Sequence, residues 1–355
     1  MANLLVTGGA GFIGANFVRY WRREKPADAI IVLDALTYAG NRASLDGVDD
    51  IEFLHGDIRD QELVGGLIED RDIDTVVHFA AESHVDRSIS GPDSFIDTNI
   101  VGTHSLLKAA KAAWLDKGSG RPHRFHHIST DEVYGTLGLE DPAFSEITPY
   151  APNSPYSASK AASDHLVRAY HHTFGLAVTT TNCSNNYGPY QFPEKLIPLF
   201  ILNALHGRHL PIYGDGMQIR DWLYVEDHCE GIRLALEQGV PGECYNIGGG
   251  AELPNIEVIE TLCTAIDAAF AADPDLCRRF PAAPAAQGRP TADLKRHVTD
   301  RPGHDRRYAI DDSKAQNALG YRAKHGFDRR FAETLHWYLA NEGWWRAILA
   351  RNQAA

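Results

Sequence analysis

The first two dozen residues restrict the fold more than any other part of the chain. Asn3 to Thr7 has the character of a short buried strand, and it leads directly into the turn at residues 8–14, GGAGFIG. A helical run, Ala15 to Arg23, follows the last glycine. Glycines at this spacing allow a tight turn, close approach of backbone N–H groups to a pyrophosphate, and close packing of helix on strand. The pattern predicts a dinucleotide-binding βαβ unit.

A second apolar run indicates which dinucleotide would bind. Ile30 to Leu33 reads as a strand, and Asp34 follows it twenty residues after Gly14. A carboxylate there can accept hydrogen bonds from the hydroxyls of an adenosine ribose, and it would repel a 2′-phosphate. The sequence therefore predicts NAD rather than NADP.

Strand-like and helix-like runs keep alternating after Asp34, which predicts an α/β fold with a doubly wound parallel sheet of the Rossmann type. The predicted strands cover 51–54, 75–79, 124–128 and 178–181, and the predicted helices between them cover 61–69, 98–114 and 156–170. Asp57 falls where an adenine amino group would lie, and Ala80 and Ala81 are small enough to let the backbone approach a cofactor.

The regular alternation stops near residue 184. We therefore predict an NAD-binding domain over 1–184 that carries the catalytic residues, and a smaller α/β substrate domain over 185–355. Segments within 220–250 are expected to return partly to the first domain. The alanine- and proline-rich stretch 264–290 is interpreted as an irregular insertion or linker. Further predictions are a turn at 212–216, a strand at 218–225 and helices at 313–319 and 327–345.

Two groups of polar residues carry the predicted chemistry. Thr130, Asp131 and Glu132 follow the strand 124–128, and ligands of open α/β sheets bind at such strand ends. Tyr156 and Lys160 lie four apart behind Pro155, which favours a helix start, so they share one helical face. A nearby cation favours a phenolate, which makes Tyr156 a candidate general base. Chance also produces such pairs, but the preceding nucleotide-binding turn favours the functional interpretation.

Charge and cysteine content limit the possible partners. The formal net charge is −13, which argues against a nucleic-acid or anionic-membrane partner and requires a local basic cluster for any anionic substrate. The five cysteines show no Cys-x-x-Cys spacing, which fits a reducing compartment. The sequence shows no metal-ligand pattern, membrane span or signal peptide, and a cytoplasmic location is the resulting expectation.

Taken together, these segments resemble the extended short-chain dehydrogenases, and within them the nucleotide-sugar 4,6-dehydratases. The matching stretches are 7–14, 80–88 (AAESHVDRS), 129–135 (STDEVYG), 155–160 (PYSASK), 183–198 (CSNNYGPYQFPEKLIP), 220–228 (RDWLYVEDH) and 300–311 (DRPGHDRRYAID). The Thr-Asp-Glu triplet at 130–132 is the specific part. Sugar epimerases of the same superfamily typically carry small or uncharged residues there, so the acidic pair points to elimination of water.

The resemblance implies a lyase that uses tightly bound NAD, oxidises a nucleotide-diphosphate sugar such as dTDP-glucose at C4, eliminates water across C5 and C6, and returns the hydride to C6. It implies catalytic roles for Thr130, Asp131, Glu132, Tyr156 and Lys160. The implied cofactor contacts are Gly8, Gly11, Phe12, Ile13, Gly14, Asp34, Thr37, Asp57, Ile58, Ala80, Ala81, Ser83, Asn99, Tyr156 and Lys160. The implied substrate contacts are Asn185, Lys195, Leu196, Pro211, Tyr213, Arg220, Asn255, Arg301 and His304.

Three of the implied contacts, Lys195, Arg220 and Arg301, would form the local basic cluster that a diphosphate needs in a chain of negative net charge. The alternatives are a UDP-sugar 4-epimerase or UDP-glucuronate decarboxylase on the same scaffold, and a non-catalytic NAD-sensing protein. The acidic pair disfavours the epimerase, and the intact Tyr156 and Lys160 disfavour the sensor. The residues leave the choice between dTDP and UDP open. A homodimer is the family expectation.

Overall fold

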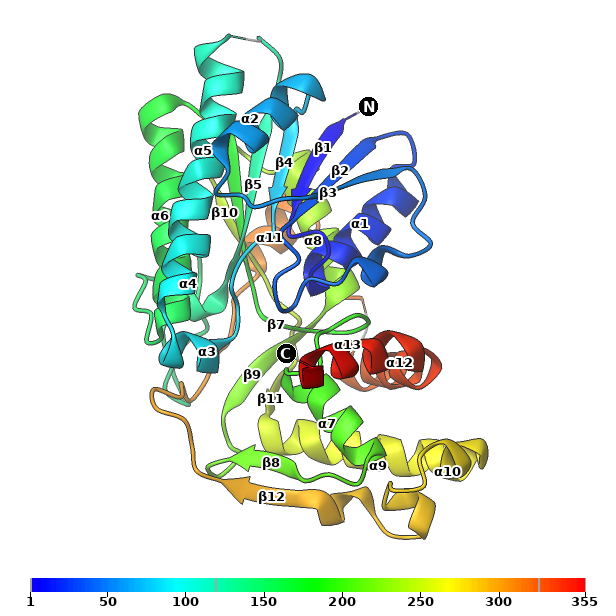
Figure 1. Ribbon diagram of the computed structural model, residues 1–355. Helices are drawn as coiled ribbons and strands as arrows, with labels where there is room; N and C mark the ends of the chain where they lie inside the picture. Colours follow the sequence, from blue (N-terminus) through cyan, green and yellow to red (C-terminus); the bar gives the residue numbers. More distant parts are fainter. Residues whose placement is uncertain (1, 119, 325, 355) are drawn as a thin grey trace.

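The computed structural model describes residues 2–118, 120–324 and 326–354. Its centre is a seven-stranded sheet in which every pair of neighbouring strands is parallel, in the order β10-β6-β5-β4-β1-β2-β3 (Figure 1). The strands are β1 (Asn3–Thr7), β2 (Ala29–Asp34), β3 (Ile51–His55), β4 (Thr75–His78), β5 (Arg124–Thr130), β6 (Val178–Cys183) and β10 (Cys244–Ile247). The predicted doubly wound sheet is confirmed.

The strand order creates the crevice in which a ligand can bind. The chain moves outward from β1 to β2 and β3, then returns to β4 on the other side of β1 and continues to β5 and β6. The connections on the two sides of β1 therefore lead in opposite directions, and a crevice opens at the carboxyl ends of β1 and β4. The last strand, β10, adds to the far edge beside β6.

Helices cover both faces of this sheet because alternate side chains of each strand point to opposite sides. Leu5 and Val76 belong to a core beneath α2 (Gln61–Asp70), α5 (Thr103–Lys111) and α6 (Pro155–Phe174). Leu4, Val6 and Val77 belong to a second core beneath α1 (Phe12–Glu24) and α8 (Val225–Gln238). Both faces of the central strands are therefore buried, which explains their continuous apolar sequence.

The long helix α6 has strong signals at both ends. The Ser154 side chain accepts from the backbone N–H of Ser157, the Ser157 hydroxyl bonds back to the Ser154 backbone, and Pro155 is the first helical residue. Gly175 ends the helix with a φ of 77°. A capping box, an N-terminal proline and a left-handed glycine each satisfy or avoid unpaired backbone groups, so the helix is fixed in length and register.

The rest of the chain forms a second, smaller mass with its own core (Figure 1). Its strands are β7 (Asn185–Tyr187), β9 (Ile219–Tyr224) and β11 (Glu252–Pro254) in one sheet, and β8 (Leu210–Tyr213) with β12 (Lys295–Val298) in another. Its helices are α7 (Leu196–Leu205), α9 (Asn255–Ala272), α10 (Asp275–Arg279), α12 (Phe327–Ala340) and α13 (Glu342–Ala354). The predicted domain boundary at residue 184 stays a prediction.

Shorter elements connect these parts. They are η1 (Arg42–Leu45), α3 (Val85–Ser90), α4 (Asp93–Phe95), η2 (Ile96–Gly102), η3 (Ala112–Asp116), η4 (Asp131–Tyr134), η5 (Ala285–Gln287), η6 (Thr291–Leu294) and α11 (Ser313–Leu319). Within the described ranges, no helix combines the length and apolarity needed to cross a bilayer.

Two sequence predictions for the second part were wrong, and a third was right in part. The stretch 264–290 is no linker, because α9 runs to Ala272 and the side chains of Leu276 and Phe280 are buried in the core of this smaller part. The predicted helix 327–345 is two helices that separate at Asn341. The predicted turn at 212–216 is present over residues 214–216, while residues 212 and 213 belong to β8.

Candidate active site

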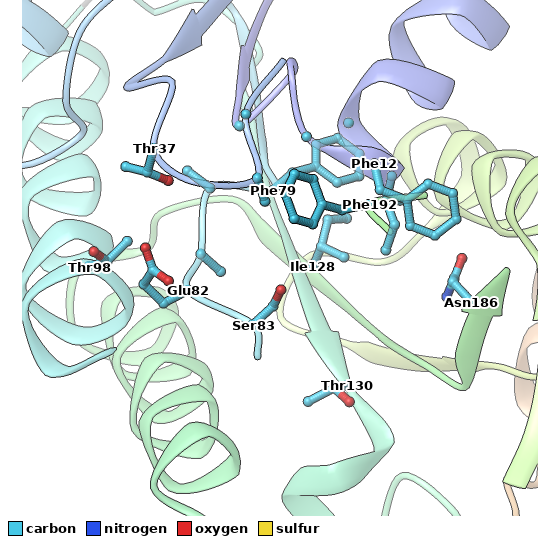
Figure 2. A pocket seen from close by; sticks show the side chains of 18 of the residues that line it. Phe12, Thr37, Phe79, Glu82, Ser83, Thr98, Ile128, Thr130, Asn186 and Phe192 are labelled. Carbon is cyan, nitrogen blue, oxygen red and sulfur yellow. The ribbon is translucent and has the colours of Figure 1, made fainter. Parts of the chain in front are cut away.

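A cavity of about 390 Å³ opens at the carboxyl ends of the central strands. Figure 2 shows it from close by, with the rings of Phe12, Phe79 and Phe192 gathered on one side, and with Glu82 and Thr130 among its polar groups. Of the predicted cofactor and catalytic residues, those that line it are Gly8, Gly11, Phe12, Ile13, Gly14, Asp34, Thr37, Asp57, Ile58, Ala80, Ala81, Ser83, Thr130, Asp131, Glu132, Tyr156 and Lys160. The fold thus brings together residues that are far apart in sequence.

In the glycine turn at one end of the cavity, the backbone packs too closely for side chains. Gly8 has a φ of +70°, and a Cβ there would lie 2.5 Å from the backbone nitrogen of Ala80. A Cβ at Gly14 would lie 2.3 Å from the carbonyl oxygen of Gly8. Helix α1 starts at Phe12 with no capping side chain and no acid in its first turn. Its first N–H groups and its dipole are therefore available to an anion.

Asp34 ties the second strand to the glycine turn. One carboxylate oxygen accepts from the backbone N–H of Ala10 and the other from that of Leu36, each at 2.8 Å. Burial raises the pKa of this carboxyl, while the two N–H groups act in the opposite direction. Each oxygen keeps a further lone pair for a ribose hydroxyl. Asp57 is engaged differently, because its carboxylate forms a salt bridge with Arg59 at 2.7 Å.

Tyr156 and Lys160 both point from α6 to the end of β5 and are 9% and 5% exposed. The Lys160 ammonium donates a hydrogen bond to the carbonyl oxygen of Ile128 at 2.8 Å. The pKa of Tyr156 is raised well above its usual value, first by burial and then by the charge of Glu132, while a hydrogen bond with Thr130 acts to lower it. We expected Lys160 to lower the pKa of Tyr156. In the described chain, Lys160 is not among the groups that act most on the pKa of Tyr156, and desolvation dominates.

The two neighbouring carboxyls Asp131 and Glu132 lie in different electrostatic surroundings. Burial, the charge of Glu132 and that of Asp221 raise the pKa of Asp131 well above its usual value. Its Oδ2 atom is buried and has no hydrogen-bond partner among the described residues. Burial also raises the pKa of Glu132, but Lys195, Arg301 and Arg220 all act to lower it. The surroundings therefore favour a protonated Asp131 beside an ionised Glu132.

Asn99 does not line the cavity. Its amide nitrogen donates to the carbonyl oxygen of Glu82 at 3.0 Å and to the Ser159 hydroxyl at 2.8 Å, and its amide oxygen accepts from the backbone N–H of Glu82 at 2.9 Å. Asn99 therefore holds the loop that carries Ala80 to Ser83 against α6. The predicted cofactor role of this residue would act through that loop.

The predicted substrate residues divide into two groups. Asn185, Lys195 and Leu196 line the cavity. The others lie outside its lining: Pro211, Tyr213, Arg220, Asn255, Arg301 and His304. Arg220 is only 5% exposed, and its guanidinium lies 4.2 Å from the centre of the Tyr308 ring. The amide oxygens of Asn185 and Asn255 are buried without a hydrogen-bond partner among the described residues. Buried polar atoms usually have a partner, so a bound ligand is a candidate donor to each.

Sequence reasoning missed several residues of the cavity, including Tyr38, Phe79, Glu82 and Phe192. Phe192 lies in the stretch 183–198 that carried the resemblance, so a signal was present. Tyr38 gave none, because its ring is placed by the Arg87 guanidinium, 3.8 Å from its centre, and by an edge contact with Phe192. Within the described ranges, no group of three or more potential metal ligands is found.

The parallel sheet of this order, the glycine turn and the paired tyrosine and lysine on α6 define the class of the protein, the extended short-chain dehydrogenases. More narrowly, the chain belongs to the family described as GDP-mannose 4,6 dehydratase, whose model matches residues 5–334. A dTDP-glucose 4,6-dehydratase of Xanthomonas campestris pv. campestris (strain B100) is 55% identical over 354 residues, which cover 98% of this chain and 96% of the relative.

Solved structures agree with this placement. DesIV, a dTDP-glucose 4,6-dehydratase from Streptomyces venezuelae solved with NAD and TYD bound, has a TM-score of 0.86 and 48% identity, with 98% of this chain and 99% of DesIV covered. A UDP-glucose 4-epimerase from Thermotoga maritima has a TM-score of 0.81 but only 26% identity, with 96% and 99% covered. Epimerases therefore share the fold, while the sequence is much closer to the dehydratases.

Proposed function

We propose that this chain is a dTDP-glucose 4,6-dehydratase that converts dTDP-glucose to dTDP-4-keto-6-deoxyglucose and water with NAD as its resident cofactor, and so supplies deoxysugar synthesis, for example of rhamnose. The observation that carries the proposal is the pair Asp131 and Glu132, which lines one cavity together with Tyr156 and Lys160. The electrostatic surroundings favour one acid and one base in that pair. The high identity to named dehydratases supports the same conclusion.

The chain fits NAD at the end of the cavity built from the glycine turn. Gly8, Gly11 and Gly14 would admit the pyrophosphate against the start of α1, and Asp34 would receive the adenosine ribose. NAD, when bound, accepts a hydride from the sugar and returns it, and its oxidised ring carries a positive charge. The positive charge of the cofactor ring would favour the ionised form of Tyr156, which burial opposes in the described chain.

In the oxidation step, Tyr156 accepts the proton of the sugar 4-hydroxyl. Lys160 supports its ionisation, and Thr130 hydrogen-bonds the same oxygen. In the elimination step, the 4-ketone acidifies the C5–H bond. Glu132 removes that proton, and Asp131 donates a proton to the departing 6-hydroxyl. A proton acceptor beside a proton donor requires two carboxyls with separated pKa values, and the different neighbours of Asp131 and Glu132 supply that separation.

The basic residues serve the diphosphate and the elimination together. Lys195, Arg220 and Arg301 all act to lower the pKa of Glu132, so their positive charges lie near the acidic pair. Guanidinium groups bind phosphate oxygens in a bidentate manner, which suits Arg220 and Arg301. The proposed nucleotide is dTDP. The buried amide oxygens of Asn185 and Asn255 are candidate acceptors for groups of the substrate.

One experiment separates this proposal from its rivals. Purified protein is incubated separately with dTDP-glucose, UDP-glucose and UDP-glucuronate, and the products are identified by mass spectrometry. A 4-keto-6-deoxy product from dTDP-glucose supports the proposal. A mass-neutral conversion to the galactose epimer would support an epimerase, and loss of carbon dioxide from UDP-glucuronate would support a decarboxylase. Bound NAD with no conversion would favour the NAD-sensing alternative.

We also infer a homodimer. Three large apolar side chains are exposed along one flank, Ile89 on α3 and Ile96 and Val101 on η2, at 42%, 45% and 49%. Both segments pack against α6, and in Figure 1 α3 lies near the lower end of α5. A second copy would cover these side chains. Light scattering after gel filtration should give twice the chain mass, and Val101→Glu should lower it.

A cytoplasmic location is the last part of the proposal. All five cysteines are free thiols, and three of them are buried. Unpaired thiols are typical of proteins in a reducing compartment. Fractionation of cells that express the chain should find it with cytoplasmic markers.

A further inference from the structure

Asp164 is a buried carboxylate for which the proposed mechanism has no role. It lies on α6, eight residues after Tyr156 and four after Lys160, so the three side chains follow one another along the same helical face. Asp164 is 5% exposed, and its hydrogen-bond partners lie on β5 and in the segment before α6. A buried carboxylate is unfavourable unless partners stabilise it, so its neighbours decide what it does.

Three donors hold Asp164 in its ionised form. His127 Nε2 lies 3.0 Å from Oδ1, while the Ser129 and Tyr150 hydroxyls lie 2.7 and 3.0 Å from Oδ2. The Tyr150 oxygen accepts from the amide of Asn182 at 3.3 Å, which leaves its own proton for Asp164. Burial raises the pKa of Asp164 to about 6, so it is ionised at neutral pH. His127 is held neutral, since burial lowers its pKa well below the usual value.

Lys160 lacks any such set of partners. Its hydrogen bond to the Ile128 carbonyl provides one acceptor, and burial lowers its pKa. Of the charges that act to raise the pKa of Lys160, that of Asp164 is the largest. The other titratable groups that face Lys160 or Asp164 from neighbouring elements are His78, His127, Tyr134, Tyr150, Cys183 and Cys244, with His165 on α6 itself. Burial keeps the first six of these neutral near pH 7.

We propose that Asp164 is a positioning residue that keeps Lys160 charged and thereby supports the ionisation of Tyr156. The inference rests on the proposed function, because it assigns the source of the charge that the oxidation step needs. The Asp164 carboxylate lies one helical turn beyond Lys160 and does not line the cavity, so it would not contact the sugar. It therefore affects the rate of oxidation without contributing to substrate affinity.

A competing effect has the opposite sign and is smaller. An ionised Asp164 also repels a phenolate at Tyr156 directly. Eight residues of helix rise separate them by roughly 12 Å along the axis, whereas Lys160 lies about 6 Å from each along the same axis. The charges that act most on Tyr156 are those of Glu132 and Asp131, and neither Asp164 nor Lys160 is among the larger causes. The ranking of the two effects therefore rests on distance: along the helix Lys160 lies half as far from Tyr156 as Asp164 does, so its charge acts more strongly on the phenol.

The test is the pH dependence of the first half-reaction. Absorbance of the reduced cofactor is followed in single turnovers with dTDP-glucose from pH 5 to 10, for the wild type and for Asp164→Asn. In Asp164→Asn we expect the acid limb of the pH–rate profile to move to higher pH by about one unit. The oxidation rate on that limb would then be about tenfold lower, with KM unchanged. Asp164→Glu, which restores the charge, should return the limb toward the wild-type position.

Asp227→Asn is a matched control. Asp227 is also a buried carboxylate, 2% exposed, and it lies 3.8 Å from the Arg330 guanidinium on the other side of the protein. Its loss should lower the melting temperature and leave the acid limb in place. If Asp164→Asn fails to fold, Tyr150→Phe replaces it. That variant keeps the carboxylate but removes one donor, so it should shift the limb upward by a smaller amount.

Two outcomes overturn the inference. An acid limb that stays in place in both Asp164→Asn and Tyr150→Phe would make Asp164 a residue of stability alone. A downward shift would show that direct repulsion dominates. Failure of the proposed function is recognised separately, because the wild type would then give no product from dTDP-glucose at any pH.

Discussion

The two ends of the cavity are built by different means. The cofactor end is made of backbone, with three glycines at which the chain packs too closely for a Cβ atom, and with a helix start that offers free N–H groups. The end proposed to hold the sugar is made of ionisable side chains, with the neighbours Asp131 and Glu132 in the lining and Arg220, from a distant strand, acting on both. Backbone geometry tolerates any ligand of the right shape, whereas buried charges must be matched to a reaction. The first end therefore defines the superfamily, and the second defines the chemistry.

The largest expected effect comes from Tyr156, which lies where the two ends meet. Tyr156→Phe keeps the ring and removes the proton acceptor, so turnover should fall by about 10³ to 10⁴, or about 4 to 5 kcal/mol of barrier. NAD content after purification should stay at the wild-type level. Tyr38→Phe is the control, because it removes the same atom from another tyrosine of the cavity lining. Near-normal turnover in Tyr156→Phe would reduce the Tyr-x-x-x-Lys pair to packing.

A somewhat smaller effect should separate elimination from oxidation. Glu132→Gln has nearly the same volume but cannot accept the C5 proton, so elimination should slow by about 10² to 10³ while oxidation at C4 continues. Reduced cofactor should then accumulate in single turnovers, and exchange of the C5 proton with solvent deuterium should slow in parallel.

Glu82→Gln provides the comparison for that variant, since Glu82 lines the same cavity outside the acidic pair. It should dehydrate within a few-fold of the wild type. Dehydration and exchange at wild-type rates in Glu132→Gln would show that Glu132 is structural, and the epimerase alternative would regain support.

The cofactor end was also the part that could be predicted from the sequence. A strand, a glycine turn, a helix and an acid at fixed spacing are local features, and β1, α1 and β2 formed as those features indicated. The parallel sheet followed from the alternation of runs. The Pro155 to Lys160 stretch predicted the start of α6 because its capping signals are local too.

The sugar end could be predicted only in part. The Asp131 and Glu132 pair was visible, but the charges that distinguish the two carboxyls, such as those of Lys195 and Arg301, come from distant parts of the sequence and meet only in the fold. The raised pKa of Tyr156 was missed for the same reason, because desolvation depends on everything packed around the ring. The stretch 264–290 was misread because its burial depends on α12 and α13.

A moderate effect is expected at the cofactor end from Asp34→Ala. Loss of the ribose acceptor should weaken NAD binding by about tenfold to a hundredfold, and loss of the negative charge should relax the exclusion of NADP. Isothermal titration with both cofactors measures this. Glu52→Ala is the control, because Glu52 lies outside the cavity lining and its carboxylate is paired with Arg71 at 2.8 Å. Unchanged affinities in Asp34→Ala would place the ribose elsewhere.

The smallest effect is expected from Arg301, one of the basic residues proposed to bind the substrate. Arg301 lies 3.5 Å from Asp86 and is partly exposed, and we propose that its guanidinium grips a phosphate. Arg301→Lys keeps the charge and loses the planar fork, so KM for dTDP-glucose should rise by about three- to tenfold, or about 1 kcal/mol, with kcat nearly unchanged. Arg306→Lys, in the same loop but paired with Asp215 at 3.1 Å, should leave KM unchanged.

Because Arg301 also acts to lower the pKa of Glu132, a truncation of Arg301 to alanine should reduce kcat as well, and more at low pH. If Arg301→Lys and Arg301→Ala gave the same KM and the same kcat, the guanidinium would neither bind the phosphate nor affect the pKa of Glu132. The basic cluster would then contain two residues instead of three.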